Sequence, residues 1–414
     1  MDHPRYIQPP EHCTGCALCA NVCPRDTIRM IFNNEGFLVP QVDIGNCINC
    51  GLCVKMCPAQ PGHLKELYSA TRKKVNPIAY GGWHTQQDTH VNSSSGGIFS
   101  ALSEWIFSRG GCVYGVVWRD KCTASFCKAE NMRELAPMRG SKYTQAVPEM
   151  VYREVKTELK RGRYVLFVGT GCQVYALQKY LRQPCEKLLT VDIICAGVPS
   201  RHLLTSYIRH QEKNHNRELH HLNFRHKDGN WLNYKVQNIF TDGKTVAEST
   251  SVSMFMNMFL SGQVLNKCCY SCPHINISRR GDLTLGDYWG VQYYDTKWPI
   301  ADGIASIVAS TDKGRKIVES LAQSGLIELY PQSFSKLYKG QPHSYNIKKR
   351  KRFPDNRSEV LEILRSRPLA EVHETCYNHI RICGLKVHRR SIWARLAKLP
   401  SKISSVWQKL FPSS

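Results

Sequence analysis

The sequence lacks long hydrophobic runs and is poor in acidic residues. No apolar stretch approaches the roughly 20 residues that a transmembrane helix needs, and the first residues lack the charged and then apolar layout of a secretory signal. We therefore expect a cytoplasmic protein. Asp and Glu number 33 against 56 Lys and Arg, for a formal net charge of +23. Residues 341–414 hold 16 basic and 5 acidic residues, so the last fifth of the chain carries nearly half of the excess.

Such a basic chain raises the question of nucleic-acid binding. Nothing in the first 340 residues resembles a nucleic-acid-binding module, so we expect no nucleic-acid partner. The remaining positive charge suits an acidic redox partner or an anionic cofactor. With 414 residues, 42% of them hydrophobic, the chain is long enough for two or three domains.

The sequence is rich in cysteine, and eight of its 19 cysteines lie in two copies of one pattern. The pattern is Cys-x2-Cys-x2-Cys-x3-Cys-Pro, which is the spacing of bacterial two-cluster ferredoxins, where the last cysteine of each run ligates the other cluster. Zinc sites share the Cys-x2-Cys spacing, but a proline after each fourth cysteine favours clusters, and the close spacing disfavours disulfides. We assign two [4Fe–4S] clusters, the first to Cys13, Cys16, Cys19 and Cys57, and the second to Cys47, Cys50, Cys53 and Cys23.

The middle of the chain has the order of a parallel α/β unit. Residues 164–168 and 188–194 are short apolar runs typical of buried strands, and a glycine turn and a helix over 174–181 lie between them. The turn imitates a dinucleotide fingerprint, but Val174 stands where the third glycine is required, which disfavours a Rossmann site. From residue 221 the Asp-Gly pairs predict hairpins, and residues 254–260 predict a buried apolar segment.

Residues 92–110 predict a helix that opens on serines and glycines. Apolar residues recur there at helical spacing after the sequence Ser93-Ser94-Ser95-Gly96-Gly97. A helix start of this kind presents backbone N–H groups that suit a phosphate or pyrophosphate. An ordinary Ser-Gly loop that caps the helix is the alternative interpretation.

Four further cysteines suggest a third metal site. Cys172 and Cys195 each follow a predicted parallel strand, where α/β folds place their ligands. Cys269 and Cys272 form another Cys-x2-Cys pair, although the adjacent Cys268 is an alternative ligand. A lone cysteine in such a turn is more often a small buried hydrophobe, so spacing alone leaves both interpretations open.

Six motifs together resemble the coenzyme F420 hydrogenase/dehydrogenase beta subunit family, which includes plant 7-hydroxymethyl chlorophyll a reductase. They lie at residues 94–97, 140–145, 169–173, 195–200, 269–272 and 286–290. The resemblance implies an iron–sulfur flavoprotein whose third [4Fe–4S] cluster is held by Cys172, Cys195, Cys269 and Cys272. It also implies a flavin, FAD, bound through Ser94, Ser95, Gly96, Gly97, Ser141, Lys142, Tyr143, Gln145, Gly169 and Thr170.

Two positions depart from the family. Gly171 stands where proline is common, and Ala196 stands where histidine is common. Without an imidazole beside the cluster and the flavin, we expect a different proton donor or a different substrate. Coenzyme F420 is therefore a candidate cofactor that the resemblance alone does not assign.

The expected fold is a multidomain α+β and α/β protein. A ferredoxin-like 2[4Fe–4S] module over residues 1–62 and a linker over 63–77 precede an α/β flavin-binding domain. The resemblance divides that domain into two parts, residues 78–160 and residues 161–335. Residues 336–414 form a basic, partly amphipathic helical tail.

The expected activity is electron transfer between a low-potential donor, either a ferredoxin or a reduced deazaflavin, and an organic substrate of unknown identity. The clusters pass single electrons, and the flavin can exchange them for a hydride. Relatives in anaerobic bacteria occur with cell-surface polysaccharide synthesis, which suggests one setting by analogy. The alternative is a non-catalytic electron-transfer subunit of a larger redox complex. No residue is assigned as catalytic.

The tail has two notable features. Residues 348–352 are a basic run, and residues 358–365 and 391–410 alternate apolar with basic residues. An amphipathic basic helix predicts either packing on the body or peripheral contact with the inner face of a membrane. The remaining cysteines have no motif around them and are expected to be plain thiols: Cys112, Cys122, Cys127, Cys185, Cys376 and Cys383.

Overall fold

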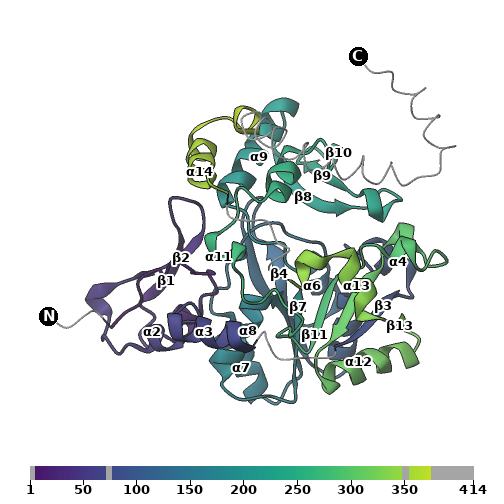
Figure 1. The fold of residues 1–414 in the computed structure, drawn as a ribbon, viewed down its shortest axis with the longest axis horizontal. Coiled ribbons are helices and arrows are strands. Elements are labelled where there is room, and N and C mark those ends of the chain that lie inside the picture. The colour runs from purple at the N-terminus through teal and green to yellow at the C-terminus, as the bar shows by residue number, and fades with distance from the viewer. Residues whose placement is uncertain (1–4, 71–76, 347–353, 374–414) are drawn as a thin grey trace.

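An eight-stranded mixed sheet forms the centre of the molecule (Figure 1). The computed structural model describes residues 5–70, 77–346 and 354–373. The strands lie in the order β13-β3-β12-β11-β7-β6-β4-β5. Their bounds are β3 Ile78–His84, β4 Cys112–Trp118, β5 Ala124–Ala129, β6 Val165–Thr170, β7 Leu188–Ile193, β11 Leu283–Asp287, β12 Ala305–Ala309 and β13 Ile327–Gln332.

The centre of this sheet is parallel, as the sequence predicts. β4, β6, β7 and β11 pair in parallel, whereas β5, β12, β3 and β13 join as antiparallel edges. On β6, Leu166 faces one hydrophobic cluster while Val165 and Phe167 face another. Burial on both faces explains the continuous apolar run. β3, β4 and β5 come from residues 78–160 and the other strands from 161–335, so both expected parts of the domain share one sheet.

Helices cover both faces of the sheet. α5 (Ile98–Phe107) and α12 (Asp312–Gln323) pack on one face. α7 (Val151–Lys160) and α8 (Gly171–Leu181) pack on the other face. The hydroxyl of Thr170 and the side chain of Gln173 form a capping box that starts α8 directly after β6. Shorter helices complete the layers: α4 Gln87–Val91, α6 Met132–Leu135 and α13 Phe334–Gly340.

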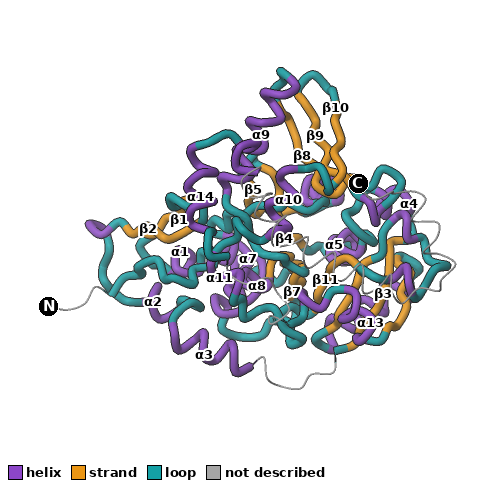
Figure 2. The backbone as a smooth tube through the Cα atoms, turned by 45° about the horizontal axis from the view of Figure 1, so that its top comes forward, coloured by secondary structure: helices purple, strands orange, loops and turns teal. Residues whose placement is uncertain are grey.

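A smaller layer stands above the C-terminal ends of the parallel strands (Figure 2). It contains the sheet β10-β9-β8 and the helices that pack on it. Phe255, Met256 and Met258 are fully buried there, so residues 254–260 are core as predicted. The elements are α9 Arg201–His215, β8 Leu219–His226, β9 Lys235–Phe240, β10 Thr245–Ser249, α10 Met254–Ser261, α11 Lys267–Tyr270 and α14 Arg357–Ser366.

The N-terminal module lies at one edge of the molecule (Figure 1). It consists of α1 Leu18–Val22, β1 Ile28–Phe32, β2 Leu38–Val42, α2 Leu52–Met56 and α3 Pro61–Ala70. Leu18 is fully buried against α7 and α8. Asn21 accepts a hydrogen bond from the backbone N–H of Tyr152 at 3.1 Å, and Arg153 donates to the carbonyl of Asn21 at 2.7 Å. The module is therefore packed and hydrogen-bonded onto the α/β domain.

A buried ion pair fixes the β1–β2 hairpin to the C-terminal helix. Arg357, which is fully buried in α14, forms a bidentate pair with Glu35 at 3.2 and 2.8 Å. Ser200 also donates from its hydroxyl to the carbonyl of Glu35 at 2.6 Å. Val360, Leu361 and Leu364 of α14 join the core of the small layer. The described part of the expected tail thus packs on the body.

Several predictions about the tail lie outside the described residues. These are the basic run 348–352, the amphipathic segment 391–410, and the thiols of Cys376 and Cys383. Within the described residues, no helix combines the length and the apolarity that crossing a membrane would demand.

The Glu35–Arg357 pair makes a stability prediction. Glu35→Gln leaves a buried guanidinium facing a neutral amide, and we expect a loss of about 2 kcal/mol in the free energy of unfolding. The loss is at the low end for a broken buried pair because the Glu35 side chain is 36% exposed. Arg315→Gln, which removes a surface pair on α12 with Glu319, is the matched control and should lower the free energy of unfolding much less. If denaturant unfolding showed equal losses of stability in both variants, the stabilising role of the Glu35–Arg357 pair would be contradicted.

Candidate functional site

The first predicted thiol group is brought together by the fold. Burial raises the pKa of Cys13 to about 12, and the nearby Cys16 and Cys57 add to the rise. Burial likewise raises the pKa of Cys57 to about 11, with Cys16 as the next contributor. The pKa of Cys19 is raised by burial and by the other three thiols. Cys57 therefore joins the three cysteines of the first run, as the ligand exchange between runs predicts.

The second thiol group lines a small surface hollow. Cys23, Cys47, Cys50 and Cys53 all face this hollow. Burial and then Cys50 raise the pKa of Cys53. Burial opposes ionisation of Cys23, but hydrogen bonds from the Thr27 hydroxyl and from nearby backbone N–H groups lower its pKa overall. Cys50 is exposed whereas the thiols of the first group are buried or half-buried, so this second group is the outer one.

The third group gathers at the C-terminal ends of β6 and β7. Burial raises the pKa of Cys172, followed by the effects of Cys272 and Cys195. The Thr170 hydroxyl lies 3.1 Å from the Cys172 sulfur. The sulfurs of Cys268 and Cys269 are 4.0 Å apart. The structure thus gathers all of these cysteines and keeps both Cys268 and Cys269 as candidate fourth ligands.

None of the three groups has the spacing of a mononuclear metal site. Within the described ranges, no three His, Cys, Asp or Glu side chains are close enough to hold one ion. Thiols around a cubane lie farther apart than ligands of one ion, because each sulfur binds a different iron. Four thiols are the donor set that a [4Fe–4S] cluster takes, so the chemistry of these side chains is compatible with clusters.

The first and third groups are neighbours. Cys16 is close enough to Cys172 to raise its pKa. Tyr152 is fully buried between them, and Cys16 and Cys172 are the thiols that most raise its pKa after burial. Its hydroxyl donates to the carbonyl of Cys16 at 2.7 Å. The outer second group, the first group and the third group therefore form a series leading into the α/β domain.

A cationic cavity of about 270 Å³ lies between the large sheet and the small layer. Ser94, Ser141 and Lys142 line it, which brings together three of the residues predicted to bind FAD. The Ser94 hydroxyl accepts hydrogen bonds from the backbone N–H and the hydroxyl of Ser141 at 3.0 and 3.2 Å. No carboxylate is among the lining residues, and the charged or titratable side chains there are Arg139, Lys142, His221, Arg225, His226 and Lys227.

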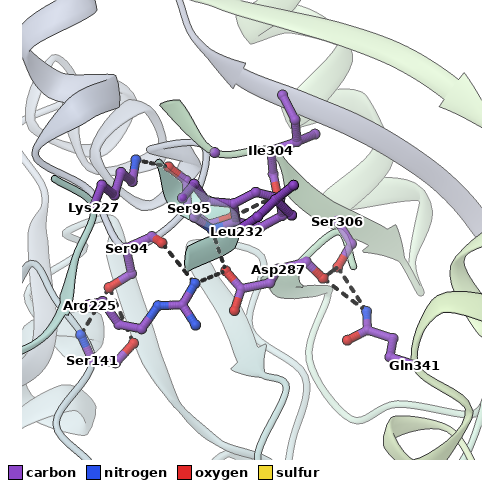
Figure 3. Close-up of polar contacts among 12 residues, drawn as sticks. Ser94, Ser95, Ser141, Arg225, Lys227, Leu232, Asp287, Ile304, Ser306 and Gln341 are labelled. Carbon is purple, nitrogen blue, oxygen red and sulfur yellow. Dashed lines mark hydrogen bonds and ion pairs between the residues drawn. The ribbon is translucent and has the colours of Figure 1, made fainter. Parts of the chain in front are cut away.

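Arg225, which lines this cavity, is held by polar contacts to Ser94 and Asp287 (Figure 3). It is 4% exposed, it pairs with Asp287 at 2.9 Å, and its guanidinium lies 3.8 Å from the ring centre of Tyr234. Burial opposes its charge, but Asp287 and the nearby tyrosines raise its pKa overall. Its Nε is buried and has no hydrogen-bond partner among the described residues. A buried cation with an unused donor suits an anionic ligand.

Lys227 and Lys142 line the cavity and donate hydrogen bonds to backbone carbonyls around it. The ammonium of Lys227 donates to the carbonyls of His90 and Ser95 at 2.8 and 2.9 Å, and also to that of Asp302. The ammonium of Lys142 donates to four carbonyls of residues 137–140 at 2.8–3.1 Å. Burial lowers the pKa of Lys142 to about 7 and that of Lys227 to about 8, while the carbonyls favour the protonated form. Each lysine therefore holds nearby backbone segments in place through hydrogen bonds from its ammonium group to their carbonyls.

The other residues predicted to bind FAD do not line the cavity. The Ser95 hydroxyl donates to the carbonyl of Ile304 at 2.7 Å. Gly97 has φ +80° at the start of α5. Tyr143 packs edge-on against Phe224 in the core of the small layer. These residues shape the surroundings of the cavity.

Three more of these predicted residues lie beside the thiol groups. The Gln145 amide accepts a hydrogen bond from the backbone N–H of Leu38 at 2.8 Å and donates to the carbonyl of Thr14 at 3.0 Å. It therefore connects the N-terminal module to the domain. Gly169 and Thr170 end β6 directly before Cys172.

Sequence reasoning missed Arg139, Arg225 and Lys227. Arg225 and Lys227 belong to no recognised motif, although Asn223, Arg225 and Lys227 alternate along the chain at β8. Residues two apart on a strand share a face. Asn223 and Arg225 both line the cavity, so their alternation on β8 is the signal that could have identified Arg225, whereas Lys227 lies just beyond the strand.

Gly96 gives a test of how the cavity is built. A Cβ at this position would lie 2.3 Å from the carbonyl of Gly82 and 2.8 Å from the N–H nitrogen of Ala305, both of them backbone atoms of the large sheet. We expect Gly96→Ala to lower the free energy of unfolding by about 3 kcal/mol. Gly62→Ala, on an open face of α3 with nothing within 4 Å, should change it by less than about 1 kcal/mol. The melting temperatures of the two variants, monitored by circular dichroism, test this expectation. A Gly96→Ala variant that melts at the wild-type temperature would contradict the packing described.

Comparisons with known proteins find matches for two regions of the chain, each of which contains predicted cluster cysteines. Residues 162–333 match the family that describes the C terminus of the coenzyme F420 hydrogenase/dehydrogenase beta subunit. Residues 12–60 match the 4Fe-4S dicluster domain. Benzylsuccinate synthase activating enzyme from Thauera aromatica is 42% identical over 38 residues, which are 9% of this chain and 12% of that enzyme.

Among solved structures, a chain of the F420-reducing [NiFe] hydrogenase complex from Methanosarcina barkeri is similar, with a TM-score of 0.47 and 18% identity. The similarity covers 70% of this chain and 92% of that chain. The two family matches support an iron–sulfur redox role at a coarse level. The resemblance expected from the six motifs is thereby confirmed: residues 162–333 match the C terminus of the coenzyme F420 hydrogenase/dehydrogenase beta subunit, and a 4Fe–4S dicluster domain precedes that region.

Proposed function

We propose that this protein is an iron–sulfur flavoprotein oxidoreductase. It exchanges electrons between a low-potential donor and an organic substrate through three [4Fe–4S] clusters and FAD. The observation that carries the proposal is that α1, which begins two residues after Cys16, packs against α8, whose second residue is Cys172. Because electron transfer requires short separations between centres, this contact makes the N-terminal module part of one conducting chain with the domain.

The residues around the cavity fit an anionic cofactor. Ser94 and Ser141 supply hydroxyl groups, and Arg139, Arg225 and Lys227 supply positive charge. The unused Nε of Arg225 is a donor that an anionic group in the cavity could satisfy. Because the lining is cationic and holds no carboxylate, we propose that the cavity receives the phosphate-bearing part of the cofactor. When bound, the flavin would supply the exchange between single electrons and a hydride.

The sheet relates the cavity to the third thiol group. Asp287, which holds Arg225, ends β11. β11 is parallel to β7, and Leu285 pairs with Ile193 shortly before Cys195. The polar floor of the cavity and the third group therefore lie at the same edge of the sheet, where α/β folds bind ligands. This arrangement supports a flavin next to the third cluster.

Metal and flavin content test the proposal directly. Protein purified without oxygen should contain about twelve irons and an equal amount of acid-labile sulfide per chain, together with one FAD. About eight irons without flavin would contradict the third cluster and would favour an electron-transfer subunit. Candidate substrates, including sugar- and lipid-linked intermediates, can then be assayed by reoxidation of the reduced protein.

Replacement of a single cysteine tests the third group. Cys172→Ala should lower the iron content by about four per chain, because a cubane that loses one thiolate is readily lost. Cys185→Ala is the matched control, since Cys185 is half-buried and lies beside an apolar cluster, and it should keep the full complement of iron. The same iron content in both variants would contradict the assignment.

A further inference from the structure

The outer thiol group has the most open position in the series. Cys50 is exposed, whereas Cys53 and Cys23 are buried behind it. Two isoleucines near this group are also exposed to solvent, Ile44 at 62% and Ile48 at 59%. Exposure of large aliphatic side chains beside a cysteine of a redox group indicates a contact surface more than a solvated loop.

Positive charge lies beside Ile48 at the hollow of the second group. Arg5 and Arg25 line the hollow of the second group, and no carboxylate lines it with them. Neither arginine pairs with a carboxylate in the part of the chain that the structure describes. Asp26, the acidic residue next to Arg25, is engaged by Arg153 at 2.6 Å. The rim of the hollow therefore has an excess of positive charge.

We infer that this surface, formed by Arg5, Arg25, Ile44 and Ile48 around the second thiol group, docks a small acidic protein that carries one electron at a time, such as an acidic ferredoxin. The inference rests on the proposed function. Charge complementarity argues for an acidic partner, since opposite charges steer encounters and fix orientation. The exposed isoleucines supply the apolar centre of the contact.

The partner transfers one electron to the outer cluster at each encounter. At each encounter the partner is oxidised by one electron and the outer cluster is reduced by one electron. Two encounters supply the pair that reduction of an organic substrate requires, and the protons come from water. The order runs from the second group to the first and then to the third, because α1, which follows Cys16 of the first group, packs against α8, which carries Cys172.

Stopped-flow reduction of the complete, cluster-loaded chain tests the docking surface. The probe is a reduced acidic bacterial ferredoxin, and the comparison reductant is the methyl viologen radical, which is small and needs no docked face. For Arg5→Glu with Arg25→Glu, we expect the second-order rate constant with ferredoxin to fall at least about tenfold at low salt. The wild-type rate should fall as salt rises, and the rate of the variant should not.

Two further variants sharpen the test. Lys316→Glu reverses an exposed charge on α12, far from the N-terminal module, and should leave the ferredoxin rate unchanged (Figure 1). Ile44→Ser alters the apolar centre outside both cysteine runs and should lower the rate by about threefold. Its iron content should stay that of the wild type, which keeps the test valid if the charge-reversed protein loses a cluster.

The outcomes separate the two proposals. An unchanged ferredoxin rate in both Arg5→Glu/Arg25→Glu and Ile44→Ser would overturn the docking surface. So would a wild-type protein that viologen reduces and ferredoxin does not, and in that case the proposed flavoprotein activity would stand. A wild-type protein without the third cluster or without flavin would overturn the proposed function, and the ferredoxin rate would still decide the docking surface.

Discussion

The docking of the N-terminal module against the α/β domain is the constraint on which the rest of the structure depends. A cluster that sits in a small module serves a distant site only if the module is held rigidly. The contacts that hold it include the buried Leu18, the Gln145 amide between Thr14 and Leu38, and the Glu35–Arg357 pair. They hold α1 against α8, the helix that carries Cys172, and they join the N-terminal module and the α/β domain into one unit.

The positions of the polar residues follow from the same design. The parallel strands end at one edge of the sheet, and their turns supply Cys172 and Cys195 on one side and Asp287 on the other. The small layer above this edge contributes Arg225 and Lys227 from β8 and the following turn, which encloses the cavity. Buried cations are costly unless they are paired. Asp287 and the loop carbonyls provide that pairing and leave Arg225 Nε for a ligand.

The sequence predicted the features that local spacing controls. The eight N-terminal cysteines, the unit β6-α8-β7 and the buried segment 254–260 all depend on residues close together in the chain. The rest depends on contacts between distant segments. Gln145 belongs to a motif that suggested FAD, yet its amide connects the module to the domain. Arg357 looked like part of a basic tail, yet it is fully buried against Glu35. No periodicity indicates such partners, because they are 107 and 322 residues apart.

The most direct test of the account is electron paramagnetic resonance of the fully reduced protein, with quantitation of spins. Three [4Fe–4S] clusters in series should give about three spins per chain. The signals should also be broadened by coupling between neighbours, and the coupling that involves the third cluster should be lost in Cys172→Ala. Two spins per chain, with a spectrum that Cys172→Ala does not change, would contradict a third cluster beside the first and with it the conducting chain.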